Sequence, residues 1–430
     1  MLPPDAMATT DQLERSETGG GDPDGSAGGA GGSAPRGIER RATPRETGAG
    51  AWRSPGLVLF AVAWGANHFV PLLLVYRAQL ALDAAQIALL FGMYALGLVP
   101  GLLLAGPVSD RRGRRAVALP AACVALAASL VLGAGGGSFG ALLLGRLLYG
   151  LGAGGAMSAG ATWVVELSEL GDAVPGTGAR RATIALSAGF GLGPLASGAI
   201  AQYLPAPTLL PYAIHVALLG GLLIAARGAP DVGDRAPPGP LLRIELDRAG
   251  WRSFARGVVP MAPFVFGFPA IAVAALPGML AGALGGAPIV YTGLIAGLTL
   301  GAGVVVQPVT RRLAPVNGSR LGLLVGTAGL VLGALAVARQ VAALLLVVAP
   351  VLGAGYGMAM TGGFQTVQRL ARPDARGGIT GLYYVLCYLG FVAPYLLAVA
   401  ARGSAPAIGL AVIAGLAACA ALGLPRELRR

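Results

Sequence analysis

The sequence predicts an all-α membrane protein with twelve transmembrane helices arranged in two six-helix bundles. Three features lead to this fold class: few charged residues, recurring long apolar runs, and a pattern that repeats in two halves. Charged residues make up 12% of the 430-residue chain and the mean hydropathy is +0.72, whereas soluble domains carry about 25% charged residues. Because the runs are continuously apolar and do not alternate, helices are favoured over the strands of a β-barrel.

Each apolar run of about 18 residues or more is a candidate membrane span. The expected spans cover residues 55–76, 84–106, 116–134, 139–164, 181–203, 207–227, 257–281, 288–308, 320–338, 341–362, 378–400 and 405–424.

The arginines predict how these spans are oriented. All 31 basic residues are arginine; 27 lie on one side of the predicted spans, Arg146 lies inside one, and only Arg77, Arg339 and Arg402 lie on the other side. Since cytoplasmic loops are enriched in basic residues, we expect both termini to lie in the cytoplasm. The protein itself is expected in the plasma membrane. The arginines sit in short loops between spans, which argues against a nucleic-acid partner.

Composition divides the chain into five parts. Residues 1–53 contain a Gly-rich stretch, Gly19–Ser33, without apolar periodicity, and are expected to be a disordered cytoplasmic tail with or without a regulatory role. Residues 54–228 and 257–424 form the two predicted bundles, residues 229–256 a cytoplasmic linker, and residues 425–430 a C-terminal tail. In the linker, Arg248, Arg252 and Arg256 recur every four residues. This spacing fits either an interfacial helix or a solvated linker.

The charged segment Gly106–Arg115 joins the second and third spans. It holds one acid, Asp110, beside four arginines, and a related segment, Gln307-Pro-Val-Thr-Arg-Arg, follows span eight with Arg311 in the place of Asp110. The two halves therefore echo each other. Duplicated six-helix halves are typical of transporters whose substrate path runs between them.

Three patterns in these spans resemble motifs of the major facilitator superfamily (MFS) of transporters, over about residues 54–424. Motif A is resembled by Gly106, Asp110, Arg111, Gly113, Arg114 and Arg115. Motif B is resembled by Arg146, Gly150 and Gly152. Motif C, the antiporter motif, is resembled by Gly189, Gly193, Pro194, Ser197 and Gly198, with Ser197 in the place of a glycine.

The resemblance implies transport by alternating access, and motif C implies proton-coupled export more than import. The leading interpretation is efflux of a small apolar or amphipathic molecule by a monomer in the lipid bilayer. An importer or facilitator of the same fold is the alternative, and a non-transporting receptor or assembly protein is a third. The sequence lacks a Walker A motif, HExxH, CxxC and a supported GxSxG, so we expect no enzyme, catalytic residue, cofactor or metal site.

Two charged residues are assigned roles at this stage. Asp110, in the motif A-like segment, is expected to act as a conformational switch by pairing with arginines. Arg146 lies inside span four, where a charge is costly. One interpretation is that Arg146 takes part in proton coupling or faces the substrate. The alternative is that it makes a purely structural pair with a backbone carbonyl. Glu166, Arg180 and Arg181 either extend a cytoplasmic charge network or belong to a solvated loop.

Small residues and polar side chains complete the candidate site. Gly150 and Gly154 in span four, and the motif C-like residues in span five, predict close helix packing. Span one offers only Asn67 and His68 as polar candidates, and His68 is a candidate proton carrier. His215 is less favoured because span six lies peripherally in the family's arrangement. Tyr384 and Tyr388 lie four residues apart in span eleven. They either line a substrate path or pack against neighbouring helices.

Overall fold

The computed structural model describes residues 50–170, 174, 176–232, 244–372 and 376–425. The predictions for most of the tail 1–53, for the centre of the linker 229–256 and for residues 426–430 lie outside this part of the chain. The described residues form helices and no strand. Eleven helical segments are long and apolar enough to cross a membrane, and one more apolar helix, Leu210–Ala226, has 17 residues. The predicted all-α membrane fold is confirmed.

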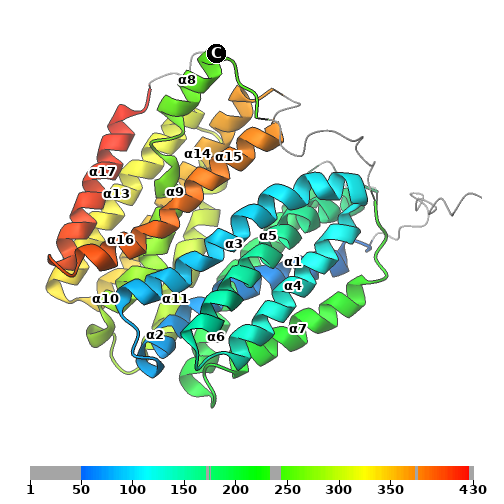
Figure 1. The fold of residues 1–430 in the computed structure, drawn as a ribbon. Coiled ribbons are helices and arrows are strands. Elements are labelled where there is room, and N and C mark those ends of the chain that lie inside the picture. The colour runs from blue at the N-terminus through cyan, green and yellow to red at the C-terminus, as the bar shows by residue number, and fades with distance from the viewer. Residues whose placement is uncertain (1–49, 171–173, 175, 233–243, 373–375, 426–430) are drawn as a thin grey trace, which may run out of the picture. The chain divides into compact units, whose positions relative to one another are not determined.

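The first half of the chain, residues 50–232, contains seven helices. They are α1 (Arg53–Asn67), α2 (Phe69–Gln79), α3 (Ala84–Arg112), α4 (Arg114–Ala134), α5 (Phe139–Leu170), α6 (Thr177–Tyr203) and α7 (Leu210–Ala226). Figure 1 shows α3 to α7 gathered on one side of the seam between the halves. Within this half α5 packs closely against α3 and α4, and α1 packs against α6.

The second half, residues 244–425, contains ten helices. They are α8 (Arg248–Gly257), α9 (Ala262–Ala270), α10 (Leu276–Met279), α11 (Pro288–Val305), α12 (Gln307–Thr310), α13 (Pro315–Arg339), α14 (Leu345–Leu370), α15 (Arg376–Tyr388), α16 (Ala393–Ala400) and α17 (Pro406–Gly423). The two halves meet mainly where α6 packs on α11 and where α3 packs on α15 and α16.

Prolines interrupt three of the membrane-length segments. The first segment breaks at His68, between α1 and α2, three residues before Pro71. In the second half a π-helical turn, Ile271–Ala275, separates α9 from α10 next to Pro269 and Pro277, and a 3₁₀ turn precedes Pro394 between α15 and α16. Proline has no N–H to donate, so the ladder of helical hydrogen bonds is broken near each site.

Several helices outrun the apolar stretches that predicted them. α3 continues to Arg112, so Gly106 lies within a helix, and the expectation that it belongs to the segment joining two spans is wrong. The turn itself is Gly113, at φ +102°. α5 likewise continues to Leu170. The apolar length reports the thickness of the hydrocarbon layer, whereas polar residues prolong the same helix beyond it. The helix predicted around Arg248–Arg256 is present as α8.

Candidate functional site

The motif A-like segment is organised around Arg114, the first residue of α4. Its guanidinium contacts the Asp110 carboxylate, donates Nη1 to Ser109 Oγ at 2.8 Å, and pairs with Glu166 on α5 through Nη2 and Oε1 at 2.9 Å. The Asp110 side chain is 45% exposed and that of Arg114 13%. The structure therefore brings Asp110, Arg114 and Glu166 together at the arginine-rich end of the protein. It places Arg180 on the surface, and it stacks Arg181 on the Trp52 ring at 4.2 Å.

The turn at Gly113 rests on a residue that the sequence did not single out. Asp231, five residues after α7, accepts the backbone N–H of Arg115 at 3.0 Å and so caps the start of α4. A Cβ on Gly113 would lie 1.9 Å from Asp231 Oδ2, and the positive φ at Gly113 also disfavours any other residue. Nothing local marks Asp231 as a cap, because helix capping is recognised from residues that adjoin the helix.

Arg146 is buried within α5, with 1% exposure. Its guanidinium stacks between the rings of Phe69 (4.5 Å) and Tyr94 (4.6 Å), and it donates to the carbonyls of Leu90 and Ala66 at 3.4 and 3.3 Å. Such contacts fit the alternative in which Arg146 has a structural role and pairs with backbone carbonyls. Its role in coupling stays a prediction.

His68 lies at the break between α1 and α2 and is fully buried, whereas the neighbouring Asn67 is half-buried. Neither ring nitrogen of His68 has a hydrogen-bond partner among the described residues. Its ring meets those of Tyr212 and His215, both on α7, edge to face at centroid distances of 4.8 and 5.0 Å. His215 was less favoured because span six is peripheral in the family's arrangement, yet α7 packs against α1 and brings the two histidines together.

His215 is held by three hydrogen-bond partners. Its Nδ1 lies 3.0 Å from Ser129 Oγ, and its Nε2 lies 3.0 Å from the Ala61 carbonyl and 3.4 Å from the Tyr149 hydroxyl. The Tyr149 hydroxyl donates to the Val62 carbonyl at 2.9 Å. His215 is thus a positioned group, whereas the adjacent His68 has unused hydrogen-bonding capacity.

The glycines that were predicted to allow close helix packing lie at contacts between helices. A Cβ on Gly150 or Gly154 would lie 2.1 or 2.4 Å from carbonyl oxygens of α3. On α6, a Cβ on Gly189 or Gly193 would lie 2.3 Å from carbonyl oxygens of α1. Such approaches require glycine and bring the helix backbones close together.

The far end of α6 faces the second half. Gly198 and Pro194 pack on Gly293 of α11, where a Cβ on Gly293 would lie 2.5 Å from the Pro194 carbonyl oxygen. Ser197, which departs from the motif C pattern, donates its hydroxyl to the His68 carbonyl. This serine therefore ties α6 to the break in the first span, a contact that glycine lacks.

Tyr384 and Tyr388 lie beside two different cavities. Tyr384 lines a cavity of about 280 Å³ with Arg311 and Gln365. Tyr388 stacks on Phe266 at 4.6 Å and lines an apolar groove of about 610 Å³ between α3 and the α15–α16 segment. The structure thus separates two residues that the sequence grouped along one path.

At the end opposite Asp110, polar contacts join the two halves. Arg402 pairs with Asp83 at 2.9 Å, Gln202 on α6 accepts the Ile289 N–H at 3.1 Å, and Arg77 donates to the Gly278 carbonyl at 3.1 Å. Asp83 also caps α3, and the N–H of Gln86 together with Arg402 lowers the pKa of its carboxyl. These contacts link the two halves at this end.

Among the described residues, no group of three His, Cys, Asp or Glu side chains is arranged to hold a metal ion. The polar residues that lie together are arginine, histidine, tyrosine and serine within the helices, and Asp110, Arg114 and Glu166 at the arginine-rich end.

Comparisons with known proteins agree with this arrangement. A stretch of 77 residues is 40% identical to the multidrug resistance protein MdtL of Escherichia coli O139:H28 (strain E24377A / ETEC), covering 18% of this chain and 19% of that protein. Among solved structures, a POT family transporter in complex with 5-aminolevulinic acid matches with a TM-score of 0.71 and 11% identity, over 86% of this chain and 95% of that one. A D-xylose-proton symporter matches with a TM-score of 0.63 and 15% identity, over 89% and 97%.

These two structural likenesses show the fold, and the MdtL match spans less than a fifth of that relative. A family model settles the classification: the model described as Major Facilitator Superfamily matches residues 56–395. That range includes the motif A-, B- and C-like segments and the helices that meet between the halves. The chain therefore belongs to the Major Facilitator Superfamily.

Proposed function

We propose that this protein is a secondary active transporter that exports a small apolar or amphipathic molecule in exchange for protons. The observation that carries the proposal is His68: a fully buried imidazole, at a break in the first span, with both ring nitrogens unpartnered among the described residues. Discontinuous helices are where transporters of many folds place coupling-ion and substrate sites.

The chemistry of the imidazole explains why His68 is the centre of the proposal. A neutral imidazole has one N–H donor and one acceptor nitrogen, and burying both without partners is unfavourable. Histidine is also the side chain that most readily changes charge near neutral pH. A proton that reaches His68 meets a second histidine, His215, at a centroid distance of 5.0 Å.

Alternating access supplies the movement. In this proposal, the contacts of Arg402 with Asp83 and of Gln202 with Ile289 break when the end opposite Asp110 opens. The network of Asp110, Arg114 and Glu166 acts as the conformational switch at the other end. We assign the arginine-rich end to the cytoplasm, with both termini there, and place the protein in the plasma membrane as a monomer.

The direction and the cargo rest on two further observations. The α6 helix, which carries the motif C-like residues, packs on α1 through Gly189 and on α11 through Gly198, so it links the His68 break to the seam between the halves. The local identity to a multidrug resistance protein favours efflux. The groove that Tyr388 lines is mostly apolar, which suits an apolar or amphipathic cargo.

Counterflow in everted membrane vesicles tests the proposal. Candidate compounds are supplied with and without an imposed pH gradient, and accumulation inside the vesicles is measured. An exporter driven by protons accumulates its cargo only with an acidic vesicle interior. Equal accumulation without the gradient would instead establish a facilitator, and accumulation only with the opposite gradient would establish a proton-driven importer.

A further inference from the structure

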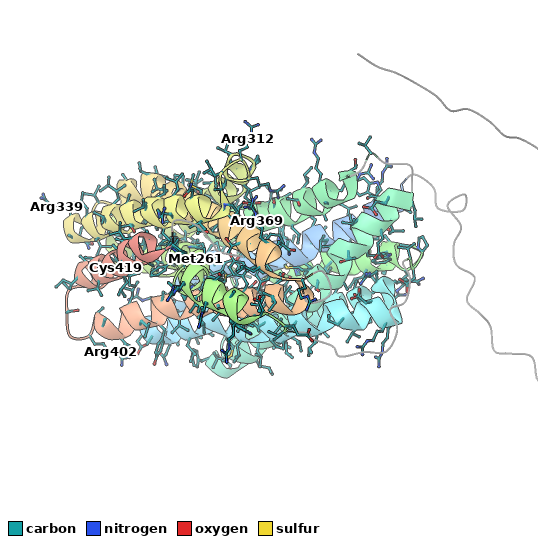
Figure 2. The ribbon with its side chains drawn as sticks, turned by 90° about the horizontal axis from the view of Figure 1, so that it is seen from above. Met261, Arg312, Arg339, Arg369, Arg402 and Cys419 are labelled. Carbon is teal, nitrogen blue, oxygen red and sulfur yellow. The ribbon has the colours of Figure 1, made fainter. Side chains whose placement is uncertain are left out.

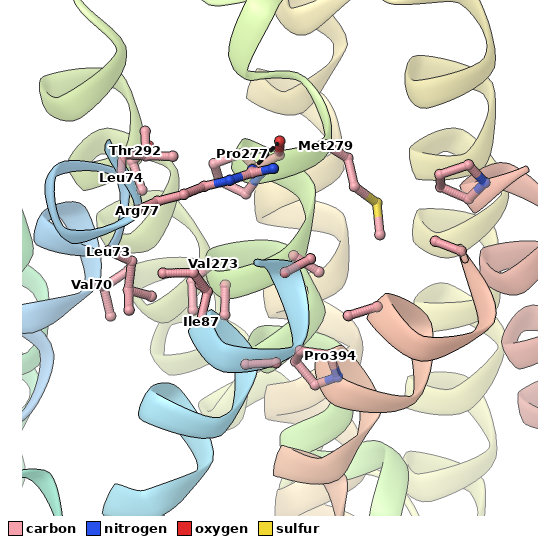
Figure 3. Close-up of a pocket in the computed structure, with 18 residues that line it drawn as sticks. Val70, Leu73, Leu74, Arg77, Ile87, Val273, Pro277, Met279, Thr292 and Pro394 are labelled. Atoms are coloured by element: carbon pink, nitrogen blue, oxygen red, sulfur yellow. Dashed lines mark hydrogen bonds between the residues drawn. The ribbon is translucent and has the colours of Figure 1, made fainter. Parts of the chain in front are cut away.

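A third cavity lies between the two halves, at the end opposite Asp110. It has a volume of about 300 Å³ and is enclosed by α2 and the start of α3 from the first half, and by α10, α11 and α16 from the second (Figure 3). Eighteen residues line it, all within the described part of the chain, and Arg77 is the only charged one. Thr292 supplies a hydroxyl, and most of the wall is alanine, valine, leucine, isoleucine and proline.

Arg77 is fixed in position within this cavity. It lies in the last turn of α2, where a cation is favoured by the helix dipole. Its side chain extends across the cavity, and Nη1 donates to the Gly278 carbonyl at 3.1 Å (Figure 3). Only one of the five N–H donors of the guanidinium is used in this bond. The remaining donors have no hydrogen-bond acceptor among the described residues.

No protein carboxylate among the described residues is placed to neutralise Arg77. The acid of this end, Asp83, is paired with Arg402 and accepts the Gln86 N–H. The Arg77 side chain is half-buried, so its spare donors are open to solvent or to a ligand. Its planar arrangement of donors matches a carboxylate, which accepts two parallel hydrogen bonds. The apolar wall then accommodates a hydrocarbon or aromatic body next to that acid group.

We propose that this cavity binds a small amphipathic acid, with the carboxylate on Arg77 and the apolar part against the wall formed by Val70, Leu73 and Val273. The proposal rests on the proposed export function and narrows its cargo to molecules with one negative charge. Because Arg77 and Gly278 belong to different halves, an acid that recruits the guanidinium also competes with a contact that closes this end.

Three matched probes test the site: 4-phenylbutyrate, 4-phenylbutan-1-ol and 4-phenylbutylamine share one apolar body and differ in charge. Binding of each radiolabelled probe is measured by equilibrium dialysis with the full chain in phosphatidylcholine nanodiscs, after subtraction of empty nanodiscs. We expect the acid to bind about 10-fold or more tightly than the alcohol, the effect of a charge-assisted hydrogen bond, and the amine to bind most weakly.

Variants assign the preference to one residue. Arg77→Gln removes the preference for the acid, and Arg77→Lys retains part of it because the charge remains. Arg339→Gln is the matched control, since Arg339 belongs to the same end but lies exposed at the edge of the protein (Figure 2). Thermal unfolding of each variant verifies that the fold is retained. Equal binding of acid and alcohol by the wild type, or an unchanged preference in Arg77→Gln, overturns the proposal.

Two additional results distinguish the acid site from a lipid site and from the export function. If phosphatidylglycerol in the nanodiscs displaces 4-phenylbutyrate from the wild type, the occupant is a lipid and the proposed cargo is wrong. Arg77-dependent binding without proton-driven counterflow supports the acid site and rejects the antiport function. Proton-driven counterflow of neutral compounds by a protein that shows no acid preference supports the antiport function and rejects the acid site.

Discussion

The imidazole rings of His68 and His215 meet edge to face with their centroids 5.0 Å apart, inside the first half of the protein. His215 is hydrogen-bonded to Ser129 and to the Ala61 carbonyl, whereas both nitrogens of His68 are unpartnered among the described residues. His215 is therefore held in place, whereas His68 is available to accept a proton. The first prediction follows from this difference.

Substitution of His68→Gln is expected to abolish accumulation driven by the pH gradient, because glutamine keeps hydrogen-bonding capacity but has no titration near neutral pH. Counterflow in everted vesicles measures the loss. Ser129→Ala is the companion variant: it removes one partner of His215 and is expected to leave some gradient-driven transport. Gradient-driven transport at the wild-type level in His68→Gln would exclude this residue from coupling.

Substitutions of Arg146 distinguish the contribution of its side-chain volume to stability from the contribution of its charge to transport. Arg146→Ala removes the filling between Phe69 and Tyr94, and truncation of a large buried side chain lowers stability by about 2–5 kcal/mol. Arg146→Met fills most of the same space and is expected to be much less damaging. Thermal unfolding in detergent distinguishes the two. If the methionine variant is as stable as the wild type but does not transport, the charge serves coupling and not folding.

The pairing of Arg114 with both Asp110 and Glu166 predicts non-additive effects on transport. Asp110→Asn is expected to slow transport while membrane insertion remains normal, because the switch loses one of its two carboxylates. Glu166→Gln is expected to act in the same direction. Since both acids work through Arg114, Asp110→Asn added to Arg114→Gln should have no further effect. Additive losses would show that Asp110 acts through another partner.

Gly113 is expected to resist substitution for two reasons, its positive φ and its contact with Asp231. Gly113→Ala should lower stability by about 1–3 kcal/mol from backbone strain, with an additional loss from the clash. Adding Asp231→Ala is expected to relieve the clash but not the strain. Gly176→Ala is the control for a positive φ without a clash, because Gly176 has φ +86° and a Cβ there meets no atom within 4 Å. Equal losses at both glycines would rule out the Asp231 contact as a constraint.

The Asp83–Arg402 contact is expected to depend on pH. The Gln86 N–H and Arg402 lower the pKa of the Asp83 carboxyl in the folded protein. A lowered pKa stabilises the fold above the unfolded pKa of about 4. This contribution is lost as the pH falls through the folded value. The midpoint of thermal unfolding of the wild type should therefore exceed that of Asp83→Asn at neutral pH, and the difference should shrink in acid. A difference that is constant with pH would contradict this.

Much of the fold follows from patterns along the chain. Continuous apolar runs located all the membrane-length segments, and prolines near His68 and Leu389 correspond to observed breaks. The capping box of α3 is also a local pattern, because Asp83 and its partner Gln86 are three residues apart. The helix ends were missed because hydropathy reports membrane thickness, and the helix of α3 continues to Arg112.

The sequence by itself determined the membrane fold class, the repeated halves and the motif-like segments, because hydropathy, glycine spacing and capping are properties of neighbouring residues. Only the tertiary structure decided which side chains meet. Arg115 and Asp231 are 116 residues apart, and Arg77 and Gly278 are 201 apart. Contacts over such separations depend on how each helix is rotated and on which helix lies beside it. For the same reason His215 lies against His68, although its span was expected to lie at the periphery of the bundle.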